Sequence, residues 1–125
     1  MITPEQFRVN EAWIAVKINE GFIFVENEPY DIYALLDASS CYVFGHVMSK
    51  VVDEIPQEKD VEELFIIAFQ AKQQWAETLI TVEGSPSNSL FKKLAEQEGL
   101  SVKTISAVEL EPILGPLKES FASIF

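Results

Sequence analysis

Two acidic residues stand where an apolar run ends, and carboxylates in such positions can hold metal ions. Asp37 follows the apolar stretch 32–36, and Glu83 follows the β-branched stretch 78–82. If both stretches are neighbouring strands, their ends could bring the two carboxylates to a common Mg²⁺ or Mn²⁺ ion, because hard cations take oxygen ligands. Metal ions held in this way support phosphoryl chemistry by clamping the attacking and leaving oxygens. On this interpretation Asp37 and Glu83 are metal ligands.

Asp37 also has a structural interpretation, which we favour. The small residues 38–40 follow it directly. An aspartate at the start of a turn commonly accepts hydrogen bonds from the backbone amides of that turn. On this interpretation the carboxylate of Asp37 closes a turn between two strands.

The only histidine and the only cysteine lie just beyond this turn. Alternation along the stretch 42–48 places His46 on the same face as Phe44 and Met48, and we expect a half-buried side chain there. No serine or cysteine nucleophile stands in a recognised frame with His46, so the sequence predicts no catalytic triad. We expect Cys41 to be a small apolar residue and not a reactive thiol.

A serine-rich loop precedes an expected helix. Residues 84–89 read Gly-Ser-Pro-Ser-Asn-Ser. The free amides at the start of a helix can bind an anion, but this stretch lacks the lysine and the glycine spacing of a phosphate-binding loop. We therefore expect the serines to cap the helix.

The charge of the chain argues against a polyanionic partner. The 125 residues include 20 acidic and 9 basic side chains, which gives a formal charge of −11. Nucleic acid is held largely by Lys and Arg at its phosphates, and an anionic membrane surface attracts the same residues. Trp13 and Trp75 have no interleaved basic residues, so we expect them in a core or an interface and not as platforms for stacked bases.

The numbers of cysteines and histidines bear on the cellular compartment in which the protein is expected. One cysteine and one histidine allow neither an internal disulfide nor a Cys/His zinc cluster. The chain shows no signal-peptide pattern and no apolar run of about eighteen residues. These features predict a cytoplasmic protein without a membrane span, and its length predicts one domain over residues 1–125.

The first half of the chain predicts antiparallel strands. Residues 12–18 form an apolar strand, and residues 22–25 continue it or pair with it across a turn at 19–21. The nearly all-apolar stretch 32–36 is typical of a central strand that is covered on both faces. Residues 42–48 then return antiparallel to it.

A helix follows, because the hydrophobic period changes to about 3.6 residues after residue 60. Asp60 and Glu63 are a plausible capping pair at its start. One apolar stripe continues as far as Trp75, and Ile66 and Ile67 occupy the opposite side. A helix of this kind is buried on two sides or covers a dimer interface.

The last third alternates strands and helices. Residues 78–82 predict a strand parallel to an earlier one, and Gly99 ends the next helix in a left-handed cap. A short strand at 102–105 and a final helix from about Pro116 complete the order. The sum is an α/β fold with a mixed sheet of about five strands, antiparallel at first and then joined by parallel crossovers, with helices on its faces.

This order of elements and two motifs resemble the catalytic core of retroviral-type integrases and DDE transposases, which has the ribonuclease H-like fold. The resemblance spans residues 12–105 and includes the stretches AWIAVKI, YDIYALLDASSCYVFGHVMS and TLITVEGSPSNSLFKKLAEQEGLSV. The family motifs are LD-x-x-S-R-x-x-x-G-W/H-x-x-S and D-x-G-x-x-[FY]-x-S-x-x-F-x-x-x-L-x-x-x-G-I. Matching positions here are Gly45, Ser49, Gly84, Ser89, Phe91, Leu94 and Gly99.

The resemblance also implies where catalytic acids would stand. The family's first aspartate falls at Val16 or Lys17, and neither residue is a metal ligand. The second corresponds to Glu83, which is one carbon longer. Asp37 is not one of the family's catalytic acids. A third acid would come from Glu109, Glu111 or Glu119.

Two functions remain open from the sequence. We expect a non-catalytic ribonuclease H-like binding or interaction module, a pseudoenzyme without a cofactor, which binds a protein partner or a second copy of itself. The alternative is a divergent metal-dependent nuclease or phosphodiesterase that uses Asp37, Glu83 and Glu109 with Mg²⁺ or Mn²⁺. A small-molecule sensor with a pocket at the carboxyl edge of the sheet is a third possibility.

Overall fold

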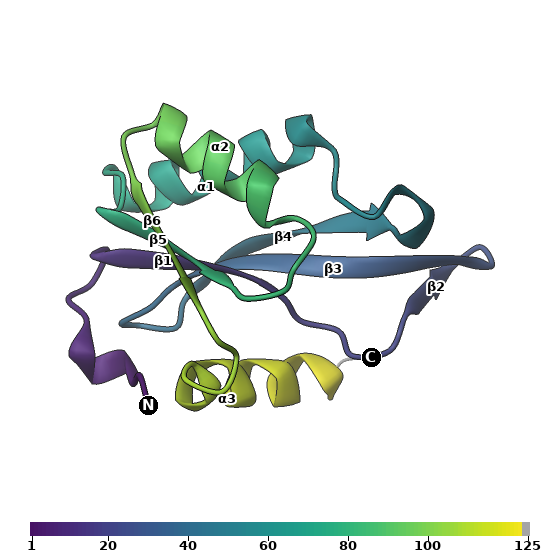
Figure 1. Ribbon diagram of the computed structural model, residues 1–125, viewed down its shortest axis with the longest axis horizontal. Coiled ribbons are helices and arrows are strands. Elements are labelled where there is room, and N and C mark those ends of the chain that lie inside the picture. The colour runs from purple at the N-terminus through teal and green to yellow at the C-terminus, as the bar shows by residue number, and fades with distance from the viewer. Residues whose placement is uncertain (124–125) are drawn as a thin grey trace.

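A mixed β-sheet with helices on both faces forms the structure, a computed structural model that describes residues 1–123 (Figure 1). The described strands are β1 (Ala12–Lys17), β2 (Ile23–Val25), β3 (Glu28–Asp37), β4 (Val43–Lys50), β5 (Thr78–Val82) and β6 (Ser101–Ile105). The described helices are α1 (Glu58–Lys72), α2 (Asn88–Gln97) and α3 (Glu111–Ala122). This architecture confirms the expected α/β fold, with six strands in the sheet where about five were expected.

The order and direction of the strands decide which chain segments meet. β3 pairs antiparallel with β4 on one side and with β1 and β2 on the other. β1 pairs parallel with β5, and β5 pairs parallel with β6. The carboxyl ends of β1, β5 and β6 therefore lie at one edge of the sheet. The carboxyl end of β3 lies at the opposite edge, because β3 runs antiparallel to β1.

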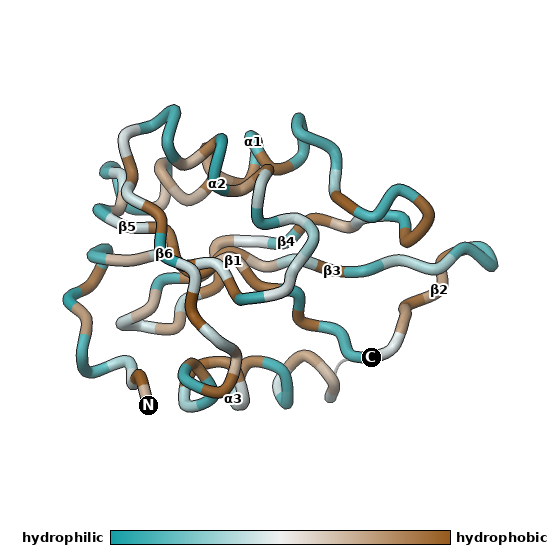
Figure 2. The backbone as a smooth tube through the Cα atoms, in the orientation of Figure 1, coloured by the Kyte–Doolittle hydropathy of each residue, from teal (hydrophilic) through white to brown (hydrophobic). Residues whose placement is uncertain are grey.

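Apolar side chains fill a layer on each face of the sheet. Alternate residues of β1 point to opposite faces, so Trp13 joins the layer under α1 and α2, and Ile14 joins the layer above α3. Both side chains are fully buried, as expected for a central strand covered on both faces. Figure 2 shows hydrophobic residues along the strands between the helical layers and a hydrophilic tip on the β2–β3 hairpin.

The pairing of β2 differs from both expected alternatives. β2 neither continues β1 nor pairs with it, and instead forms a hairpin with β3. Glu26 and Asn27 have φ angles of 51° and 68°, which is the backbone of a two-residue hairpin turn. β3 runs through Pro29, which is tolerated because the ladder to β4 begins only at Tyr30.

The start of α1 lies earlier than the expected capping pair indicated. α1 begins at Glu58 after Gln57, whose side chain makes no capping hydrogen bond, so the Asp60–Glu63 prediction is wrong. The expected buried stripe is largely confirmed, with Val61, Leu64, Phe65 and Ala68 in the core. Trp75 lies beyond the helix, which ends at Lys72.

The start of α3 is also earlier than expected. α3 begins at Glu111, with Pro112 in its first turn and Pro116 inside it. Burial of Ile113 and Leu114 against the sheet favours the helix although Pro116 removes one backbone hydrogen bond. The left-handed cap at Gly99 is confirmed by its φ of 85°. None of the helices in residues 1–123 has the length and apolarity that a membrane crossing requires.

Candidate functional site

A pocket of about 260 Å³ opens at the carboxyl ends of β1 and β5. Lys17 lines it from β1, Asp31 and Tyr33 from β3, residues 83–86 from the loop after β5, and Lys118 from α3. Open α/β sheets tend to bind their ligands in a crevice at this edge. We call it the carboxyl-edge pocket.

An ion pair occupies the β1 side of the carboxyl-edge pocket. Lys17 Nζ lies 3.8 Å from Asp31 Oδ1, and Asn19 Nδ2 donates a hydrogen bond to the same oxygen at 3.1 Å. The Lys17 side chain is 40% exposed, so this pair adds little to stability. It does place an ammonium group at the end of β1.

Two buried hydroxyl groups beside this ion pair have no hydrogen-bond partner in the described part of the chain. They are Tyr33 Oη and Ser49 Oγ. Tyr33 pairs with Lys17 across β1 and β3, and Ser49 pairs with Asp31 across β3 and β4, so all four residues belong to one face of the sheet. Buried polar groups normally have a partner, so each exception calls for an explanation.

The loop after β5 does not cap α2 in the expected way. Ser87 occupies the capping position, but its side chain makes no capping hydrogen bond. Its Oγ lies 3.0 Å from Ser85 Oγ, while Asn88 Nδ2 donates to the Val82 carbonyl at 2.7 Å. The prediction that serines cap this helix is therefore wrong. Gly84 adopts a φ of 86°, which favours glycine, and Glu83 is exposed beside it.

Asp37 lies at the opposite edge of the sheet from Glu83. It pairs with Trp13 at the start of β1, whereas Glu83 follows the end of β5. The buried carboxylate of Asp37 accepts hydrogen bonds from Asn10 N at 2.8 Å, Ser40 N at 2.9 Å and Ser40 Oγ at 2.7 Å. The turn interpretation is confirmed, and the structure does not bring Asp37 and Glu83 together.

The candidate third acids lie on the surface. Glu109 Oε2 is 3.5 Å from the N-terminal ammonium of Met1, and Glu111 and Glu119 are exposed on α3. Within residues 1–123, no three His, Cys, Asp or Glu side chains come together as a metal site would require. A divalent ion of the kind that the integrase resemblance implies therefore does not fit the residues present, since Val16 or Lys17, neither of which is a metal ligand, stands where its first ligand would be.

A β-bulge decides the position of His46. Leu36 pairs with Val43 and Leu35 pairs with Gly45, so Phe44 is an extra residue in β4. The bulge reverses the alternation: Phe44 turns into the core, and His46 and Met48 are exposed on the other face. The expected half-buried His46 on the face of Phe44 is therefore wrong.

Cys41 lies in the turn before β4 and not in an apolar setting. Its side chain is exposed and its φ is 60°, while its backbone amide donates to the Asp37 carbonyl at 2.9 Å. Partial loss of solvent around the sulfur, followed by the negative charges of Asp37 and Glu5, raises the pKa of the Cys41 thiol. A raised pKa disfavours the nucleophilic thiolate.

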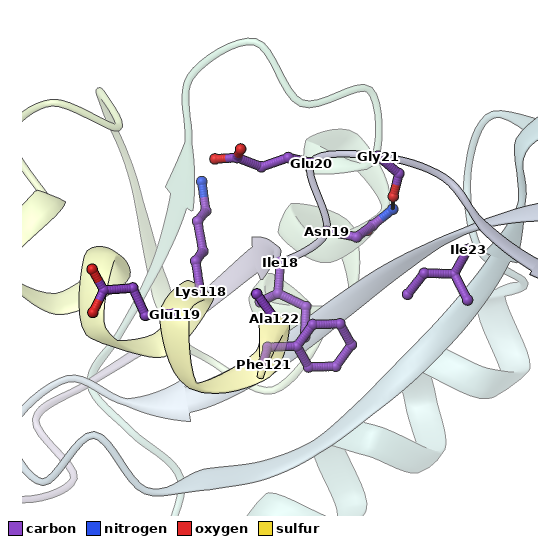
Figure 3. A pocket seen from close by; sticks show the side chains of 9 residues that line it. All are labelled: Ile18, Asn19, Glu20, Gly21, Ile23, Lys118, Glu119, Phe121 and Ala122. Carbon is purple, nitrogen blue, oxygen red and sulfur yellow. Dashed lines mark hydrogen bonds between the residues drawn. The ribbon is translucent and has the colours of Figure 1, made fainter. Parts of the chain in front are cut away.

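A second pocket of about 390 Å³ adjoins the first, and Lys118 lines both. Ile18, Ile23 and Phe121 provide apolar lining of this second pocket, between the β1–β2 loop and the end of α3. Figure 3 shows the Lys118 side chain extending from α3 toward the loop that carries Glu20, whereas Glu119 points away. We call this second space the α3 pocket.

Sequence reasoning missed most residues of the carboxyl-edge pocket. The sequence does not mark Asp31, Tyr33 or Lys118 as site residues, because none of them belongs to a recognisable motif. Alternation in the strand before Asp37 could have placed Asp31 and Tyr33 on one face. No local pattern pairs them with Lys17 or with Lys118.

Comparison with known proteins identifies proteins of similar fold but no family to which the chain belongs. No sequence-family profile and no curated protein sequence matches the chain. The HTLV-2 integrase catalytic core domain, solved in complex with magnesium in a dimeric form, matches with a TM-score of 0.57 and 14% identity, over 98% of this chain and 73% of that one.

A second solved structure gives the same result. The intasome of simian T-cell lymphotropic virus, in complex with the PP2A regulatory subunit B56 gamma, matches with a TM-score of 0.56 and 16% identity. The match covers 98% of this chain and 42% of that one, so this chain spans less than half the length of the intasome chain. The chain therefore has the ribonuclease H-like fold of integrase cores, as its motifs implied.

Proposed function

We propose that this chain, whose fold is that of retroviral integrase catalytic cores, is a non-catalytic interaction module that associates with a second copy of itself. The observation that carries the non-catalytic part is the Lys17 ammonium at the end of β1, 3.8 Å from Asp31. A divalent ion needs oxygen ligands that converge on it. A positive charge among the ligands opposes that ion by Coulomb repulsion.

The engagement of Asp37 further supports this proposal over a divergent nuclease or phosphodiesterase. That alternative needs Asp37, Glu83 and Glu109 around a shared Mg²⁺ or Mn²⁺. At the far edge of the sheet, one oxygen of Asp37 accepts a hydrogen bond from the amide of Asn10, and the other accepts one from the amide of Ser40 in the turn. Glu109 lies beside the N-terminal ammonium. Among the described residues that line the carboxyl-edge pocket, only Asp31 and Glu83 carry carboxylates, and Asp31 is paired with Lys17.

We expect Mg²⁺ or Mn²⁺ to leave the melting temperature unchanged relative to an ionic-strength-matched sodium control. A metal site at 100 times its Kd would stabilise the native state by about 2.7 kcal/mol. Differential scanning calorimetry of the wild-type chain and of Glu83→Gln measures this directly. Cleavage of single- and double-stranded DNA and RNA is measured in parallel, and we expect none.

A stabilising effect of the metal would contradict this expectation. A metal-dependent rise in melting temperature that Glu83→Gln removes would establish the metal-dependent alternative. Glu96→Gln serves as the matched control, because it makes the same charge change on an exposed carboxylate of α2 that lies outside the pocket and is not one of the candidate ligands. Metal-dependent strand cleavage that Glu83→Gln abolishes would reject the non-catalytic proposal by itself.

The self-association part of the proposal rests on the outer side of α1. Ile66 and Ile67 are 51% and 47% exposed there. Ile67 lines a shallow pocket between α1 and the edge strand β4, and Ile66 lines another between α1 and α2. We call Ile66 and Ile67 the α1 surface. This side of α1 is the second apolar side that the sequence indicated, and no element of this chain covers it in the described residues.

A second copy is the proposed occupant of the α1 surface. The chain carries a formal charge of −11, so two copies repel one another through most of their surface. Removing apolar side chains from water is the main force that can overcome this repulsion. A symmetric contact would place the same patch on both copies. The dimeric form of the HTLV-2 core supports the idea that this fold can pair.

Sedimentation velocity from low to high micromolar concentration tests the self-association. We expect a reversible dimer whose dissociation constant rises by roughly tenfold or more in Ile67→Asp, because a buried unpaired charge at an interface is costly. Val108→Asp is the control, since Val108 is equally apolar, 69% exposed and located in the turn before α3. A wild-type chain that stays monomeric throughout would reject the self-association.

A further inference from the structure

We propose that the carboxyl-edge pocket binds a small organic anion, with a carboxylate or phosphate head and an apolar body. Lys118 and the hydroxyl of Tyr33 are the proposed donors to the head. The apolar body would lie in the adjoining α3 pocket. This site is separate from the α1 surface, so it does not depend on self-association.

Lys118 supplies a positive charge that forms no ion pair with a carboxylate in residues 1–123, and its side chain extends toward the loop that carries Glu20 (Figure 3). Six ion pairs occur among residues 1–123, and Lys118 takes part in none of them. Its side chain is only partly exposed and lines both pockets. An ammonium group that forms no ion pair can attract an anion, and charge-assisted hydrogen bonds are stronger than neutral ones.

Tyr33 supplies an independent observation in the same pocket. Its side chain is 1% exposed, lines the pocket, and carries a hydroxyl without a hydrogen-bond partner in residues 1–123. Its ring packs against Phe91 of α2 with centroids 6.2 Å apart, which holds the side chain in place. A phenylalanine would fill the same space without the cost of an unpaired hydroxyl. The hydroxyl is buried from solvent, so it would gain a partner if the head of a bound ligand displaced the side chains that cover it at the pocket wall.

The loop before α2 adds favourable backbone dipoles. Residues 83–86 line the pocket, and α2 begins just beyond them without a side-chain cap. The positive end of a helix dipole and its free amides favour a negative group nearby. Of the two acids in the lining of this pocket, Asp31 is matched by Lys17, and Glu83 is exposed and thus screened by solvent. Glu20 and Glu119 line the adjoining α3 pocket and are exposed in the same way.

The α3 pocket explains why the anion would carry an apolar body. Lys118 lies at the boundary of the two pockets, and Ile18, Ile23 and Phe121 line the space on its other side. A ligand whose head reaches Lys118 and Tyr33 can bury its remaining surface there. Pockets that combine apolar walls with a few polar groups are typical of small-molecule sites.

Two-dimensional ¹H–¹⁵N NMR titration of the full chain tests this site. The probes are hexanoate and hexyl phosphate, added at ionic strength held constant with sodium chloride. We expect saturable shifts at the amides of Gly84 and Ser85 with at least one probe. Binding of hexanoate alone identifies a carboxylate site, and binding of hexyl phosphate alone identifies a phosphate site. Lys118→Gln should lower the affinity by roughly fivefold or more, because it removes the charge-assisted contact.

Two further variants separate ligand binding from structure. Tyr33→Phe should weaken probe binding while raising the melting temperature of the free protein, whereas a structural hydroxyl bond would lower that temperature. Lys92→Gln is the matched control, because Lys92 is an exposed lysine of α2 outside both pockets. The proposal is overturned if neither probe gives saturable shifts, if Lys92→Gln weakens binding as much as Lys118→Gln, or if Tyr33→Phe leaves the affinity unchanged.

Discussion

We expect Asp37→Ala to lower the free energy of unfolding by about 3 kcal/mol, because it leaves backbone amides without their acceptor. The carboxylate is fully buried and accepts three hydrogen bonds, from the amide of Asn10 and from the amide and hydroxyl of Ser40. These bonds join the segment before β1 to the turn between β3 and β4. Urea unfolding followed by tryptophan fluorescence measures the loss.

The same experiment distinguishes a structural from a functional Asp37. Carboxylates gathered at a metal site repel one another, so removing one of them commonly stabilises the protein without its metal. A large loss of stability for Asp37→Ala agrees with the turn role, and a neutral or stabilising effect would contradict it. Glu109→Ala is the control, since an exposed ion pair with the N-terminus contributes at most about 1 kcal/mol.

We expect Trp13→Ala to lower the free energy of unfolding by about 4 kcal/mol, which is within the range for removal of a large aromatic side chain that leaves a cavity in a core. Trp13 is fully buried, and its ring lies 5.2 Å from Phe44 in an edge contact and 5.9 Å from Trp75. Its indole Nε1 donates to Asn10 Oδ1 at 2.7 Å. Chemical denaturation followed by far-ultraviolet circular dichroism avoids dependence on the lost fluorophore.

A matched aromatic truncation shows whether burial causes this effect. Phe22 is 55% exposed, and we expect Phe22→Ala to change the stability by less than about 0.5 kcal/mol. Trp13 and Asp37 also share Asn10, which bonds to both side chains. The double variant should therefore lose less than the sum of the two single losses. Strict additivity would show that Asn10 does not couple them, and a loss below 1 kcal/mol for Trp13→Ala would contradict its core role.

The order of strands and helices was readable from the sequence, because hydrophobic periodicity is a local property. A continuous apolar run identified β1, and the change to a period near 3.6 identified α1. The left-handed cap at Gly99 followed from the conformational freedom of glycine. The motifs shared with integrase cores added the topology, which the structural comparison bears out.

Positions that depend on pairing between strands were not readable in the same way. Phe44 is an extra residue in β4, so the residues after it point to the opposite face from the one that simple alternation predicts. His46 is therefore exposed. The hairpin of β2 with β3 and the early start of α3 likewise depended on what each segment packs against. Pro116 was a local signal for a helix start, and burial of Ile113 and Leu114 overrode it.

The chain alone thus determined which segments are strands and helices, favoured a turn at Asp37, and placed Val16 or Lys17 at the position where the integrase resemblance implies an acid. Tertiary structure alone decided that Asp37 and Glu83 lie at opposite edges of the sheet, because β3 and β5 end in opposite directions. It also decided that Lys17, Tyr33 and Lys118 share one pocket. Local conformation follows from neighbours a few residues away, whereas a site follows from strand register and helix packing between segments up to a hundred residues apart.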